Sequence, residues 1–234
     1  MDRRVFLRAA VGGLPLLAGC KSKLITHVIA PTDDQWDDLT CICPYGPRQS
    51  QEEGGVPVEP PVVRWGKRDL AYCIVSRDKR EIRPAFWDYE VEGAFRDWSA
   101  VCDLTFERVG DPEIADILMG AAKGPEHFFD GPRGILAWAY LPTSDNFQGR
   151  LVSMFDKDER WSLSPYKEDS IFFRAVVAHE IGHLLGLRHS FEPTALMFPY
   201  YRPSLWTPQE VDDISRIRDL YTEDYNPRLA PDGK

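Results

Sequence analysis

One eleven-residue stretch, HEIGHLLGLRH, which begins at His179, constrains this chain more than any other feature. Residues four apart share one face of a helix, so His179 and His183 can direct ring nitrogens at one metal ion. Gly186 can adopt the positive φ that ends the helix, and the chain then turns back and brings His189 to the same ion. Three neutral imidazoles leave one corner of a tetrahedral zinc open for water. The stretch therefore predicts a catalytic zinc site with Glu180 beside it.

A second motif, ALMFPYY, begins at Ala195. Together with the histidine stretch it resembles the zinc signature and Met-turn of the matrixins, or matrix metalloproteinases, a family of metzincin zinc proteases. This resemblance implies that Met197 lies beneath the zinc and that Pro199 and Tyr201 wall a substrate pocket. Further similar blocks extend the resemblance to the scale of a domain: Trp65, 70–74, 129–132 and 155–161.

The resemblance implies an α+β fold, with a twisted, mostly parallel five-stranded sheet, three helices, and a zinc cleft below an antiparallel edge strand. The residue pattern indicates where these elements lie. Strands are predicted at 70–75, 104–109, 115–119 and 135–141. Helices are predicted from Pro84, from Ser170 as N-cap through the zinc stretch, and from Thr207 to Tyr221.

The resemblance also implies which residues contact a substrate. An extended peptide would add itself to the edge strand through the backbone groups of three residues: Ala137, Trp138 and Ala139. Ala175 would line the pocket for the side chain that follows the cleaved bond, and its small size would leave that pocket open. Alternatively, Ala175 only packs within its helix, and Leu205 or Trp206 fills the space.

Acidic side chains near the edge strand predict a second metal. Three carboxylates and three backbone carbonyls match a matrixin calcium site: Asp130, Asp156 and Glu159, with Gly131, Arg133 and Ile135. Such an oxygen cage suits calcium, and we expect one or more structural calcium ions. The alternative is an acidic surface exposed to solvent.

The second, structural zinc of the family is expected to be missing. Trp138 and Met154 stand where two of its histidines belong. His127 in the preceding loop is out of register. We therefore expect one zinc, the catalytic one.

Residues 1–19 are interpreted as an export signal. Basic residues, including Arg3 and Arg4, precede a short apolar run that is too short to span a bilayer. The start resembles a bacterial twin-arginine signal, and the end resembles the lipobox of bacterial lipoproteins, in which Cys20 is lipidated. These features predict a lipid-anchored protein of the bacterial cell envelope, on the periplasmic or outer face.

The rest of the chain divides into three parts. Residues 20–62 are rich in proline and lack sustained periodicity, so they are interpreted as a flexible tether. The catalytic domain is predicted to span 63–222. Residues 223–234 have the composition of a disordered polar tail.

Four further cysteines leave their pairing open: Cys41, Cys43, Cys73 and Cys102. Export makes disulfides possible, and four cysteines allow three pairings between which the sequence cannot choose. A tether thiolate could instead cap the zinc, although the cysteine-containing string that performs this role in many matrixins is absent.

Residues 20–234 carry 25 basic and 36 acidic side chains, a net charge of −11, which argues against nucleic acid as a partner. We predict a monomeric zinc endopeptidase that acts on extended peptides or proteins, with Glu180 as general base. The alternative is a catalytically silent, zinc-containing peptide-binding module. Retention of Glu180 argues against that alternative, because zinc binding alone does not require it.

Overall fold

The computed structural model describes residues 40–42, 52–53, 56–57, 61–144 and 147–222. The expected export signal, Cys20 and the expected tail at 223–234 lie outside these residues. Within the described part of the chain, no helix has both the length and the apolar character needed to cross a membrane.

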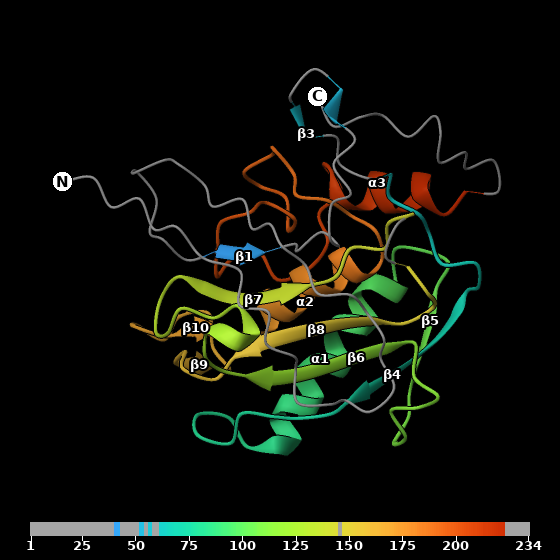
Figure 1. Ribbon diagram of the computed structural model, residues 1–234. Helices are drawn as coiled ribbons and strands as arrows, with labels where there is room; N and C mark the ends of the chain where they lie inside the picture. Colours follow the sequence, from blue (N-terminus) through green and yellow to red (C-terminus); the bar gives the residue numbers. More distant parts are fainter. Residues whose placement is uncertain (1–39, 43–51, 54–55, 58–60, 145–146, 223–234) are drawn as a thin grey trace.

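A twisted sheet forms the centre of the domain (Figure 1). Its five domain strands are ordered β7-β8-β6-β4-β5, and only β7 runs antiparallel to its neighbour β8. The strands are β4 (Asp69–Ile74), β5 (Thr105–Arg108), β6 (Ile117–Ala122), β7 (Ile135–Ala139) and β8 (Leu151–Asp156). This arrangement confirms the predicted α+β class, with a mostly parallel sheet and an antiparallel strand next to the zinc helix.

Three α-helices complete the fold: α1 (Pro84–Ser99), α2 (Phe173–Leu184) and α3 (Asp213–Leu220). Helices α1 and α2 pack against each other and against the sheet. Two buried tryptophans hold α2 through its backbone: Trp98 Nε1 donates to Ala178 O at 2.8 Å, and Trp65 Nε1 donates to Leu184 O at 2.9 Å. The first two histidines of the zinc stretch are thereby fixed on a helix whose every residue is buried.

The starts of two helices differ from the sequence-based prediction. Helix α2 begins at Phe173 rather than after Ser170, because the short strand β10 (Ile171–Phe172) first pairs with β9 (Trp161–Ser162). The Ser170 hydroxyl donates to Lys167 O and does not cap the helix. Helix α3 begins at Asp213 rather than near Thr207. The Asp213 carboxylate accepts the Gln209 N–H at 2.9 Å, so the preceding residues form a turn instead of a helical start.

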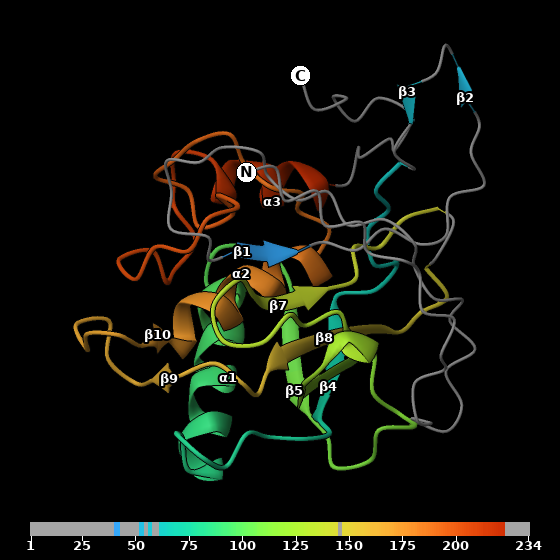
Figure 2. The ribbon, with the colours of Figure 1, turned by 60° about the vertical axis from the view of Figure 1, so that its left-hand side comes forward.

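Three short strands lie within the segment expected to be a flexible tether: β1 (Thr40–Ile42), β2 (Glu52–Glu53) and β3 (Val56–Pro57). Strands β2 and β3 form a small hairpin, and β1 pairs parallel to β7 as a sixth strand of the main sheet (Figures 1 and 2). Cys41 is opposite Ala137, and Ile42 is opposite Trp138. The edge of β7 that was expected to receive a substrate is therefore paired with the chain's own N-terminal segment.

Both cysteines of the described domain core carry free thiols. Cys73 is buried on β4, and Cys102 is half-buried after α1. Burial raises the pKa of the Cys102 thiol to about 11, which keeps it protonated and unreactive at neutral pH. Cys43 lies outside the described residues.

Candidate active site

The three histidines of the zinc stretch converge as predicted. His179 and His183 lie one turn apart on α2, and Gly186 takes a φ of 107° just beyond the helix end. This turn brings His189 back, so that ligand atoms of all three rings lie within 4.8 Å of one another. Among the described residues, no other group of three or more His, Cys, Asp or Glu side chains gathers this closely.

Hydrogen bonds determine which nitrogen two of the three rings, those of His179 and His183, present to a metal. Nδ1 of His179 lies 2.7 Å from Leu196 O, and Nδ1 of His183 lies 2.7 Å from Leu187 O. A carbonyl can only accept, so both Nδ1 atoms carry the proton and both Nε2 atoms present a lone pair. Backbone carbonyls thus set the tautomer that zinc requires.

The resulting lone pairs point at a common position. The two Nε2 atoms of His179 and His183 are 3.0 Å apart, and two acceptors at that separation repel unless a cation lies between them. Nε2 of His189 is buried and has no hydrogen-bond partner among the described residues. Ligands about 2.05 Å from a tetrahedral zinc would be separated by about 3.3 Å. The three residues therefore fit a zinc ion.

Burial also keeps these rings neutral. It lowers the pKa of His179 to about 4 and that of His189 to about 3, with a contribution at His189 from the neighbouring His179 ring. The pKa of His183 also falls well below its usual value, again mainly through burial. Neutral imidazoles are the form that binds metal, so the site is ready for zinc at neutral pH.

Glu180 is fully buried, next to His179 on α2. A carboxylate is the type of side chain that can act as general base toward water. Its role as general base stays a prediction.

Met197 packs against the zinc helix at Gly182, between His179 and His183, and its place beneath a zinc ion stays a prediction. It is fully buried, and a Cβ added at Gly182 would collide with its sulfur. Ser190 N donates to Met197 O at 2.8 Å, which ties this turn to the segment that carries His189. Our sequence reading did not single out Gly182, although only a residue without a side chain allows this contact within the zinc helix.

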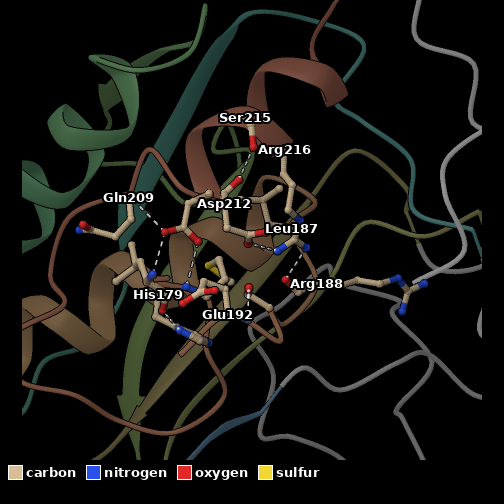
Figure 3. Close-up of polar contacts among 12 residues, drawn as sticks. His179, Leu187, Arg188, Glu192, Gln209, Asp212, Ser215 and Arg216 are labelled. Carbon is tan, nitrogen blue, oxygen red and sulfur yellow. Dashed lines mark hydrogen bonds and ion pairs between the residues drawn. The ribbon is translucent and has the colours of Figure 1, made fainter. Parts of the chain in front are cut away.

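Asp213 is a second residue that the sequence reading missed. Its buried carboxylate accepts three backbone N–H groups, from Leu196 at 2.7 Å, Met197 at 3.1 Å and Gln209 at 2.9 Å. Burial raises the pKa of this carboxyl, and the three donors oppose that shift. Figure 3 shows this network between Gln209 and His179. Asp213 therefore holds the Met-turn against α3.

A pocket with about 270 Å³ of space, part of it open to solvent, lies beside His179. Ala175 and Tyr201 line it as expected, and the Tyr201 hydroxyl is held by a 2.8 Å bond from Phe172 N. Pro199 and Trp206 are not among the residues that line this pocket, whereas Leu205 is. The use of this pocket by a substrate side chain stays a prediction. The residues that the sequence reading missed are Val176, Leu196, Phe198 and Tyr200.

The expected calcium carboxylates lie around the turn before β7. Ile135 N donates to Asp130 Oδ1 at 3.0 Å, and Arg133 N donates to Glu159 Oε1 at 2.6 Å. Asp156 is fully buried, and its Oδ2 has no hydrogen-bond partner among the described residues. Burial, together with the neighbouring carboxylates, raises the pKa of Asp156 to about 6 and that of Glu159 to about 7. The turn carries positive φ angles at Gly131, Arg133 and Gly134.

Trp138 and Met154, which stand where two histidines of the family's structural zinc belong, are directly opposite each other on neighbouring strands. Trp138 on β7 pairs with Met154 on β8, and Trp138 Nε1 donates to His127 O at 2.8 Å. A tryptophan ring thus occupies the space next to His127. The absence of a second zinc stays a prediction.

Comparison with known proteins places these features in a family. The family model described as Matrixin matches residues 64–222. Karilysin from Tannerella forsythia is 37% identical over 163 residues, which cover 68% of this chain and 33% of that protein. Human matrix metalloproteinase-26 is 36% identical over 171 residues, 71% of this chain and 62% of that protein. Stromelysin-1 from Equus caballus is 38% identical over 180 residues, 74% of this chain and 35% of that protein. The matched part therefore spans about a third of two of these relatives and under two thirds of the other.

Proposed function

This chain belongs to the matrixin family, and from that premise we propose that it is a zinc-dependent endopeptidase. The observation that carries the proposal is the convergence of three neutral histidines, the buried His179 and His183 and the half-buried His189, next to the buried Glu180. One relative is named a metalloproteinase, which states a metal-dependent proteolytic activity for that protein.

The histidines and Glu180 have different roles in the proposed reaction. His179, His183 and His189 would hold zinc, which when bound polarises a carbonyl and brings the pKa of water down to about 7. Glu180 accepts a proton from the attacking water and then passes it to the departing amine. Met197 packs against α2 at Gly182, and we propose that this contact keeps the imidazoles in place during the reaction.

The substrate would be an extended peptide. Strand β7 would offer its backbone at Ala137 to Ala139 once β1, which pairs with this edge, is displaced. The pocket beside Ala175 would take the side chain after the cleaved bond. Leu196, Phe198 and Leu205 make part of that pocket apolar. We therefore propose cleavage mainly before leucine, methionine or phenylalanine, because each buried methylene contributes about 0.8 kcal/mol.

One experiment tests activity, metal dependence and specificity together. The full chain is incubated with a mixed peptide library, with and without a chelator, and the new N-termini are sequenced. Cleavage that the chelator abolishes and added zinc restores is the expected result. A protein that holds zinc and binds peptides without cutting them would be the silent binding module instead.

We also propose a structural calcium ion at Asp130, Asp156 and Glu159, with carbonyls of Gly131, Arg133 and Ile135. Two buried acids with raised pKa values and an unpartnered Asp156 oxygen favour a cation at this turn. Metal analysis of the purified protein should find one zinc and at least one calcium per chain. Two tightly held zinc ions, or no calcium, would contradict this assignment.

We further propose that the protein is exported and held at a membrane of a bacterial envelope by lipid on Cys20. The support is the order of a basic start, a short apolar run and the Leu17-Ala18-Gly19-Cys20 string. Cys20→Ser should release the protein from membranes, and continued sedimentation with membranes would overturn the proposal. Replacement of Arg3 and Arg4 by lysine should block export if the twin-arginine route is used.

A further inference from the structure

The third zinc ligand lies on a different kind of backbone from the other two. His179 and His183 are part of α2, so helical hydrogen bonds fix their positions. His189 follows the turn at Gly186 and lies in a segment, 187–190, that is neither helix nor strand. The direction of its ring therefore depends on contacts that this segment makes with the rest of the protein.

Arg216 on α3 supplies one of these contacts. Its Nη2 donates to the carbonyl oxygen of Arg188 at 2.8 Å, and its Nη1 lies 2.7 Å from Asp212 Oδ2 (Figure 3). The Arg216 N–H also donates to Asp212 O at 3.0 Å, so backbone and side chain hold the pair in one geometry. The guanidinium thus bridges α3 and the residue directly before His189.

We propose that Arg216, oriented by Asp212, is a positioning residue for the third zinc ligand. The Arg188 carbonyl belongs to the planar peptide that ends at the nitrogen of His189. A bond to this oxygen sets the plane of that peptide and limits the φ of His189, and φ determines where its imidazole points. This inference rests on the proposed zinc site.

The identity of the two side chains fits this role. Arginine has a rigid fork of donors, so one guanidinium can hold a carboxylate and a carbonyl at once. Lysine has a single flexible nitrogen and cannot reproduce both directions. An ordinary helix ion pair would require only the contact with Asp212.

The same helix offers a matched control. Arg218 also donates to a backbone carbonyl, Val101 O at 3.0 Å, and also has an acidic partner, Glu210, at 3.6 Å. Its target lies just after α1 and not beside a zinc ligand. Arg216→Met and Arg218→Met therefore make the same chemical change at two positions of one helix, the second more exposed than the first. Only the first releases the segment that carries His189.

The test measures the zinc dissociation constant of the full chain by chelator competition. The value of kcat/KM and the thermal midpoint of the metal-free protein are measured for the same variants, so that a change in zinc binding can be told from a loss of stability. We expect Arg216→Met to weaken zinc binding about 10-fold or more, the scale of lost outer contacts at metal sites. Arg218→Met should stay within about two-fold of wild type. Arg216→Lys should recover part of the lost zinc affinity. Asp212→Asn should also weaken zinc binding, because it removes the carboxylate that orients the Arg216 guanidinium.

Two results would overturn the proposal. One is zinc affinity of Arg216→Met within about two-fold of wild type, and the other is an equal loss in Arg216→Met and Arg218→Met. If Arg216→Met does not fold, Arg216→Lys and Asp212→Asn decide the question by the same measurement, and unchanged affinity in both would overturn it. A wild-type chain that binds no zinc would instead contradict the proposed function itself.

Discussion

Asp213 and His179 are linked through a single residue, Leu196. The Leu196 N–H donates to Asp213 Oδ2 at 2.7 Å, and the Leu196 carbonyl accepts from His179 Nδ1 at 2.7 Å. A buried carboxylate on α3 therefore holds the residue whose carbonyl orients the first zinc ligand on α2. The link connects three parts of the chain that no local sequence pattern joins.

Asp213→Ala should weaken both the fold and the metal site. The change leaves the buried N–H groups of Leu196, Met197 and Gln209 without their charged acceptor, which costs about 3 kcal/mol or more of unfolding free energy. Urea unfolding of the metal-free protein measures this cost, and chelator competition measures zinc affinity. Asp219→Ala, at an exposed position of the same helix, is the control. Equal effects of the two variants would contradict the role of Asp213.

Glu180→Gln should retain zinc and lose hydrolysis. Glutamine has nearly the same shape but cannot accept the proton, so kcat/KM should fall by about 10²–10⁴-fold while zinc content is unchanged. His183→Ala is the contrasting variant, because it should lose zinc as well. Activity of Glu180→Gln within a few fold of wild type would refute the general-base mechanism.

Ala175→Arg should shift cleavage toward peptides with smaller side chains after the cut bond. Ala175 is almost fully buried and lines the pocket beside His179, so a long side chain there would occupy the space. The measurement is a cleavage map of the same peptide library for both proteins. An unchanged map, or no apolar enrichment in the wild-type map, would count against the pocket and leave the zinc mechanism standing.

Calcium removal should destabilise the protein more at high pH than at low pH. Without calcium, the folded-state pKa values of Asp156 and Glu159, about 6 and about 7, lie above the value of about 4 expected after unfolding. The folded state then holds protons more tightly, so stability is present below about pH 4 and is lost as pH rises through 6 to 7. Calcium binds the ionised acids and should offset this loss.

The measurement is the thermal midpoint with calcium or with a calcium chelator, at pH 5 and at pH 8. We expect the difference between the two conditions to be larger at pH 8. Asp156→Asn should remove most of the calcium dependence. A calcium effect that is absent, or larger at pH 5, would contradict the assignment.

Disruption of β1 should increase activity. Strand β1 pairs with β7 at Ala137 and Trp138, so a peptide that adds to this edge must first displace it. Neighbouring residues of a strand direct their N–H groups to opposite sides, so proline at both Cys41 and Ile42 removes whichever N–H bonds to β7. We expect kcat/KM of this double variant to rise several-fold on a long peptide.

Cys41→Ser separates edge pairing from capping of zinc by a thiolate. It should leave activity unchanged if β1 acts only by occupying the edge. Activation by Cys41→Ser alone would favour the thiolate. An unchanged rate in the double proline variant would show that β1 does not compete with the substrate.

The sequence by itself determined the zinc ligands and the turn at Gly186. These two features depend on short-range geometry, because helical periodicity places His179 and His183 together and a glycine at positive φ returns His189 to them. The α+β class and the role of Met197 were implied by the resemblance to the matrixins. The sequence did not determine where each helix begins. Ser170 has the side chain of a helix N-cap, but its hydroxyl donates to Lys167 O and the helix begins at Phe173.

Only the tertiary structure decided which distant groups support the site. Asp213 lies 17 residues from Leu196 in sequence, and Arg216 lies 28 residues from Arg188. The pairing of β1 with β7 joins segments still farther apart. A carboxylate or a guanidinium can bond to any backbone group that folding brings near, so residue type alone does not reveal the partner. The packing of α3 against the Met-turn and the His189 segment selects those partners.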